Sequence, residues 1–171
     1  EVALEQFWIN KEFWKGKFNV KAGEIIVPVG YTNNAHEPLN FFTCYRPEGA
    51  SYVLPNTWHQ LGISLWGRLK DWRYEVQFLA GLNADNFTTT GWIHKGPVSP
   101  LEFEIATKYG TSLRIDNYSV PGLRLGLSGY YGHSIGNSYP RNKNGVDSEY
   151  KGAVAVGSFD FTYNAHNWIV R

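Results

Sequence analysis

The chain has 171 residues and a formal net charge of +1, and only 18% of its residues are charged. This length suits one domain, placed here over residues 1–171, and the near-zero charge excludes a general attraction to nucleic acid. The single cysteine, Cys44, excludes an internal disulfide, and no apolar run is long enough for a membrane-spanning helix.

Apolar and polar side chains alternate along most of the chain, which is the period-two pattern of β-strands. The alternation is clearest from Leu61 to Leu82, where two strands flank a tight turn at Lys70-Asp71. A weaker hairpin precedes this one and further strand pairs follow it, so we expect an all-β fold of about eight strands. The predicted strands are Glu1–Trp14, Phe18–Tyr31, Leu61–Leu69, Trp72–Leu82, Leu101–Asp116, Leu123–Gly132, Ala153–Tyr163 and one that begins at Trp168.

The connections between these strands alternate between short and long. An up-and-down meander would therefore carry every short turn at one end and every long loop at the other, as transmembrane barrels do. Soluble domains rarely keep three loops of such length at one end. The short connections are Lys15–Lys17, Lys70-Asp71, Asn117–Gly122 and Asn164–Asn167, and the long ones are Thr32–Trp58, Ala84–Pro100 and His133–Tyr150.

Alternation alone fits two architectures that are inside-out versions of each other. A soluble barrel of the lipocalin type turns its apolar face inward, whereas a membrane barrel turns that face toward lipid. The loop asymmetry, a polar face rich in Gly and Ser, and aromatic residues near the ends of the apolar face all favour the second. We therefore expect an antiparallel up-and-down transmembrane β-barrel; the aromatic residues are Trp72, Tyr109, Tyr131 and Tyr163.

Four stretches of the sequence carry a family resemblance: Gly23–Gly49, Leu54–Gly67, Trp72–Phe87 and Gly122–Ser134. They resemble the phosphate-selective porins (porin O/P-like) of Gram-negative outer membranes. The resemblance implies a barrel of about sixteen strands and about twice this length, usually a homotrimer, that forms a water-filled channel for passive diffusion of small solutes. The chain has about half those strands and ends at Arg171 without a terminal aromatic residue. We therefore expect a partial barrel.

Charged residues on the polar face are the candidates for lining the pore, because low-dielectric walls focus their field on a passing solute. The basic members lie mostly beside the short turns, which predicts a mild preference for anions. The alternative is that these charges pair with one another and have no role toward solutes. The family's ladder of Arg and Lys cannot be aligned here, so phosphate specificity is not carried over. The predicted pore-lining residues are Arg68, Arg73, Glu75, Glu102, Glu104, Lys108, Arg114 and Arg124.

The long connection from Thr32 to Trp58 is rich in aromatic residues, so we expect it to fold inward and narrow the pore. The adjacent His36 and Glu37 raise the question of a metal site, but no second pair has ligand spacing, and we predict no metal. The predicted constriction residues are His36, Glu37, Arg46 and Glu48.

No hydrolase, phosphate-loop or dinucleotide motif occurs in the sequence, so we predict no enzymatic activity and no cofactor. Two alternatives stay open: an outer-membrane enzyme with its site at the barrel mouth, and a small closed barrel, filled by side chains, with a structural or adhesive role. The predicted partners are the lipid bilayer of the cell outer membrane, small solutes that include anions, and the other copies of a homotrimer.

Overall fold

The structure is a computed structural model, and it describes residues 7–34, 52, 54–55, 57–88, 90–97, 108–134 and 153–170. Within this part of the chain, strands dominate, and no helix is both long and apolar enough to cross a membrane. The strands are β1 (Phe7–Phe13), β2 (Phe18–Ile26), β3 (His59–Leu69), β4 (Trp72–Ala80), β5 (Tyr109–Asn117), β6 (Leu123–His133), β7 (Ala153–Ala165) and β8 (Trp168–Val170); the short helices are η1 (Trp14–Gly16), α1 (Tyr31–Asn34) and η3 (Ala84–Asn86).

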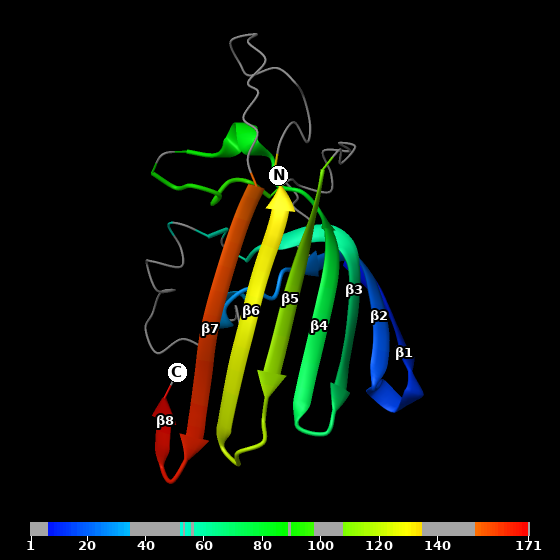
Figure 1. The fold of residues 1–171 in the computed structure, drawn as a ribbon, viewed down its shortest axis with the longest axis vertical. Coiled ribbons are helices and arrows are strands. Elements are labelled where there is room, and N and C mark those ends of the chain that lie inside the picture. The colour runs from blue at the N-terminus through cyan, green and yellow to red at the C-terminus, as the bar shows by residue number, and fades with distance from the viewer. Residues whose placement is uncertain are drawn as a thin grey trace.

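The eight strands form one antiparallel sheet in the order β1 to β8, so each strand pairs with its neighbours in sequence. The prediction of an all-β, up-and-down meander of eight strands is confirmed. The four short turns lie together at one end of the sheet, the lower end in Figure 1. We call this the short-turn end. The sheet is open, and β1 and β8 are its two edges.

The prediction that the second strand continues to Tyr31 was wrong, because β2 ends at Ile26. Pro28 has no backbone N–H to donate to a sheet ladder, so it does not fit a central strand. Gly30 has a φ of +74°, a left-handed conformation that favours glycine. The chain therefore turns away from the ladder and crosses the sheet.

The two faces of the sheet have opposite polarity to those of a water-soluble sheet. One face is polar and buried: Arg114 is 0% and Gln77 is 1% exposed. The other face is apolar and exposed, and the described residues leave it uncovered: Val76 is 41% and Phe78 is 55% exposed. Large exposed side chains of this face include Leu61, Ile63, Leu65, Trp72, Tyr109, Leu113, Leu125, Leu127, Tyr131, Phe159 and Phe161.

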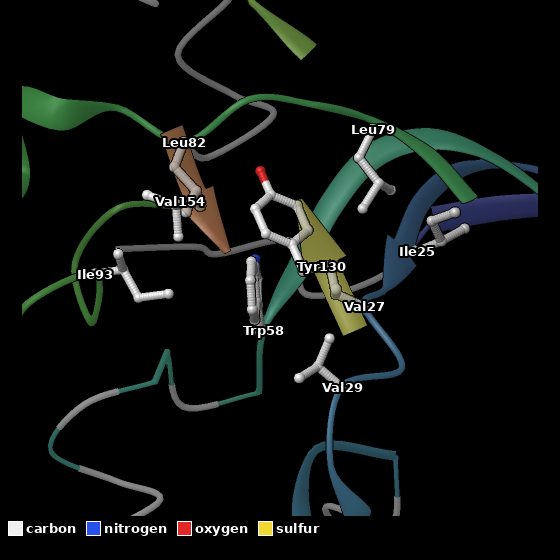
Figure 2. Close-up of a cluster of buried hydrophobic side chains, with 9 residues drawn as sticks. All are labelled: Ile25, Val27, Val29, Trp58, Leu79, Leu82, Ile93, Tyr130 and Val154. Atoms are coloured by element: carbon white, nitrogen blue, oxygen red, sulfur yellow. The ribbon is translucent and has the colours of Figure 1, made fainter. Parts of the chain in front are cut away.

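A small apolar core lies on the polar face at the opposite end from the short turns. Trp58 and Tyr130 lie side by side at its centre, with ring centroids 4.8 Å apart (Figure 2). The segments that follow β2 and β4 bring apolar residues over the strand ends, so the polar face is closed off there. The core consists of Ile25, Val27, Val29, Trp58, Leu79, Leu82, Ile93, Tyr130 and Val154.

Two glycines on the polar face leave the space that the side chain of Tyr130 occupies. A Cβ at Gly110 would lie 2.4 Å from the Tyr130 hydroxyl oxygen, and a Cβ at Gly132 would lie 2.5 Å from the same atom. Tyr130 is buried and packed against Trp58, so its ring has little freedom to move aside. Glycine at both positions is therefore a packing requirement of the core.

We expect Gly110→Ala to lower the free energy of unfolding by about 1–3 kcal/mol, the usual cost of overpacking a core. The matched control is Gly157→Ala, since a Cβ at Gly157 meets nothing within 4 Å. Midpoints of denaturant unfolding, followed by tryptophan fluorescence, measure both. Equal midpoints for the two variants would contradict the role assigned to Gly110.

Candidate functional site

Three arginines and three acidic residues on the polar face form one connected cluster, which we call the charge network. Its members come from β4 to β7, and they lie in the half of the sheet nearer to the short turns. Their formal charges cancel. The charge network consists of Arg73, Glu75, Arg114, Asp116, Arg124 and Asp160.

Arg114 and Asp116 are the most buried members, 0% and 1% exposed. The Nη2 atom of Arg114 lies 2.8 Å from Asp116 Oδ1 and 3.1 Å from Asp160 Oδ1. Arg114 Nε also donates to Asp116, at 3.0 Å from Oδ2. A buried charge is tolerated only when it is paired and hydrogen-bonded, and these contacts satisfy that condition.

Arg124 bridges the same two carboxylates, at 2.8 Å from Asp116 Oδ1 and 2.6 Å from Asp160 Oδ1. Sheet register explains this arrangement, because Gly126 stands between Asp116 on β5 and Asp160 on β7. A Cβ at Gly126 would lie 2.7 Å from Arg114 Nη2 and 2.9 Å from Arg124 Nη1. The missing side chain leaves the space in which both guanidinium groups lie.

The network continues toward the centre of the sheet through neutral polar side chains. Arg73 donates to Glu75 Oε2 at 2.6 Å and to Asp116 Oδ2 at 3.3 Å. The other carboxylate oxygen of Glu75 accepts from Ser64 at 2.9 Å and from Gln77 at 2.8 Å. Connected polar groups of this kind hold one another in place, since removal of any member leaves a buried partner unsatisfied.

The segment that follows β2 lies across the polar face, and we call Val27–Asn33 the strap. In Figure 1 it runs behind the strands, from β2 toward β6 and β7. Arg114 Nη1 donates to the carbonyl oxygens of Pro28 and Gly30, both at 3.2 Å. The Gly30 N–H donates to Ser128 Oγ at 3.0 Å. The strap is thus joined to β5 and β6, which are distant from it in sequence.

The far end of the strap is tied to the residue before β3. The Asn33 side chain donates to the carbonyl oxygens of Val27 and Trp58 and accepts from the Trp58 N–H, at 2.6, 3.0 and 2.6 Å. A cavity of about 170 Å³ lies between the strap and the residues that precede β3, and Ser158 of β7 also lines it. Its lining is Val29, Gly30, Tyr31, Thr32, Asn33, Leu54, Pro55, Trp58 and Ser158.

Two cations on the polar face contact aromatic rings and, within the described residues, make no ion pair. The Arg68 guanidinium lies 4.7 Å from the ring centroid of Tyr118. The Lys21 ammonium lies 5.0 Å from the ring of Trp8 and 5.8 Å from that of Trp66. A cation–π contact does not neutralise the positive charge, so both side chains keep a full charge on this face.

The structure brings four of the predicted pore-lining residues together, and all four belong to the charge network: Arg73, Glu75, Arg114 and Arg124. Arg68 lies outside the charge network, against the ring of Tyr118, and Lys108 is exposed just before β5. The other predicted residues lie outside the described part of the chain: Glu102 and Glu104 of the pore-lining set, and His36, Glu37, Arg46 and Glu48 of the constriction set.

The predicted pore-lining set lacks two members of the charge network, Asp116 and Asp160, and it also lacks the carbonyl oxygens of the strap. Asp160 shares its alternation with Ser158 and Thr162 on the polar face, which was the available signal. Within the described residues, no group of three or more His, Cys, Asp or Glu side chains is arranged to hold a metal ion.

One curated protein, described only as an uncharacterized protein of Aquifex aeolicus, is 32% identical to this chain over 85 residues. The match covers 50% of this chain and 19% of that protein, so the chain spans about a fifth of its relative's length. No protein-family model matches the chain. No solved structure matches it either.

We expect Asp116→Asn to lower the free energy of unfolding by about 3 kcal/mol, because it leaves buried arginines without their shared carboxylate. The control is Asp71→Asn in the exposed β3–β4 turn, which should leave stability unchanged. Denaturant unfolding at neutral pH measures both variants. A stability loss for Asp116→Asn no larger than that of the control would contradict the structural role of the network.

Proposed function

We propose that this chain is part of an outer-membrane β-barrel and that the complete protein is a porin, a water-filled channel for small solutes. The inverted polarity of the sheet carries the proposal. Its buried face holds Arg114 and Asp116, while Val76 and Phe78 on the other face are exposed. In water such a sheet would expose a large apolar surface, which soluble monomers rarely do. In a bilayer, lipid covers that surface.

The distribution of aromatic residues on the apolar face supports insertion in a bilayer. Trp72 lies beside a short turn, whereas Tyr109 and Tyr131 lie toward the other end of the sheet. Aliphatic side chains such as Val76 and Leu113 occupy the rows between them. Aromatic belts flanking an aliphatic band are typical of transmembrane barrels, because amphipathic rings favour the membrane–water interface.

The two open edges require partners in this proposal, because unpaired backbone groups are costly in the hydrocarbon core of a bilayer. We infer that further strands of the same polypeptide pair with β1 and β8 and close a barrel of about sixteen strands. The Aquifex relative, of which the match covers only 19%, is long enough for such strands. The resemblance to trimeric porins adds the proposal that three barrels associate.

The charges on the polar face support a channel of modest selectivity. The arginines of the charge network are compensated by its carboxylates, so they add little to the field in the lumen. Arg68 and Lys21 are the candidates for a mild preference for anions, since each contacts rings and pairs with no described carboxylate. A few such charges in water give weak, salt-dependent attraction.

A second candidate is a small closed barrel with a structural, adhesive or enzymatic role and no channel. One observation favours it: the polar face is crossed by the strap and filled by interlocking side chains, among them Arg114 at 0% exposure. Eight-stranded barrels are usually filled in this way. A porin would conduct ions across a bilayer, whereas a closed barrel filled by side chains would not.

We expect the full-length protein to conduct ions in planar bilayers, with a reversal potential that indicates a weak anion preference and declines as salt rises. Arg68→Glu should shift the preference toward cations. Arg68 is a cleaner probe than Arg73 or Arg114, because reversal of those charges would also disrupt the network. The control is Lys11→Glu, the same charge change on the apolar face, which should have no effect on selectivity.

A complete lack of conductance in the folded protein would contradict the porin and favour the closed barrel. If the Arg68→Glu variant and its parent both conduct with the same reversal potential, the protein is a channel but Arg68 does not contribute to its ion selectivity.

A further inference from the structure

We propose that Arg114 is a positioning residue that holds the strap across the polar face. The width of the channel and its charge preference would then depend on different residues. The effect of the strap on channel width rests on the proposed function. The attachment of the strap by Arg114 does not, and the two can be tested separately.

The geometry of Arg114 divides its donors between two tasks. Nε and Nη2 donate to Asp116 and Asp160 on the sheet, while Nη1 donates to the carbonyl oxygens of Pro28 and Gly30 on the strap. A guanidinium group is planar and presents five donors in a fixed fork, so it can serve both sides at once. A lysine ammonium at this position is a point charge without that fork.

The attachment of the strap does not depend on Arg114 alone, which suits a fixed element rather than a moving gate. Gly30 also donates to Ser128 on β6. At the other end, Asn33 makes three hydrogen bonds that join Val27 and Trp58. Val27 and Val29 are buried in the apolar core, at 0% and 1% exposure, so lifting the strap would expose apolar surface to water.

The position of the strap determines what it would do in a channel. It starts at the end of β2 and reaches β5 and β6, so it passes over the sector of the sheet formed by β3 and β4. A cavity of about 170 Å³ remains beside it, lined by the strap, by Leu54, Pro55 and Trp58, and by Ser158 of β7. A segment held in this place occupies part of the lumen through its volume and not through its charge. Its displacement would therefore widen the channel.

The test uses the full-length protein with Cys44→Ser and with Val29→Cys as a reporter, so that the new cysteine is the single thiol within residues 1–171. Val29 is 1% exposed, so a water-soluble maleimide should label the reporter slowly and only when the strap lifts. Arg114→Lys keeps the charge but loses the fork. We expect labelling about tenfold faster in this variant, the effect of losing a charge-assisted hydrogen bond.

A matched pair of serines isolates the strap from the charge network. Ser128 and Ser64 are both buried on the polar face, but Ser128 accepts from the strap, whereas Ser64 donates to Glu75 of the charge network. We expect Ser128→Ala to speed labelling a few-fold and Ser64→Ala to leave the rate unchanged. If Arg114→Lys does not fold, this pair decides the question.

Single-channel conductance of the same proteins completes the test. We expect Arg114→Lys to open briefly to a larger conductance level more often than its parent, with an unchanged reversal potential. Equal labelling of the parent, Arg114→Lys and Ser128→Ala would overturn the proposal that Arg114 and Ser128 hold the strap. Faster labelling without more frequent openings to a larger conductance level would overturn the proposal that the strap narrows the channel. A parent that does not conduct would overturn the proposed function, while the labelling rates would still decide the role of Arg114.

Discussion

The hydrogen-bonded ion pair between Arg114 and Asp116 is the interaction on which the rest of the structure depends. Both side chains are almost completely buried, so the loss of either one would leave the other as an unpaired buried charge, which is strongly destabilising. The pair fixes which face of β5 is enclosed, and because side chains alternate along a strand, it also fixes the orientation of every neighbouring residue. Leu113 and Ile115 are thereby directed to the opposite face. The register of β5 with β4 and β6 continues the same alternation on the two neighbouring strands.

The same arginine connects the sheet to the segment that crosses it. Arg114 contacts the carboxylates of two strands and the carbonyl oxygens of Pro28 and Gly30, so the charge network and the strap are a single hydrogen-bonded unit. Gly126 makes this possible by leaving room between Asp116 and Asp160. In consequence, the arginines that look most suitable for attracting an anion are compensated by neighbouring carboxylates. In the proposed channel their role is to shape the lumen.

Much of the fold could be predicted because its signals are local. Alternation from Leu61 to Leu82 identifies a hairpin and both of its faces, and the alternating loop lengths predict the meander. The strap could not be predicted, since it depends on contacts between residues distant in sequence, such as Pro28 and Arg114. Pro28 and Gly30 do signal the end of a strand, but nothing local shows where the chain goes next. The pairing of Arg73 and Arg124 with Asp116 likewise depends on sheet register.

The central claim, that the apolar face meets lipid while the polar face encloses an aqueous space, can be tested by the collision of nitroxide spin labels with two quenchers. A label at Val76 on the apolar face and one at Ser158 on the polar face would be placed in the full-length protein in liposomes. Molecular oxygen concentrates in the bilayer, and a water-soluble nickel chelate stays outside it. The account predicts that oxygen relaxes the label at Val76 more than the nickel chelate does, with the reverse order at Ser158. A label at Val76 that responds mainly to the nickel chelate would contradict it.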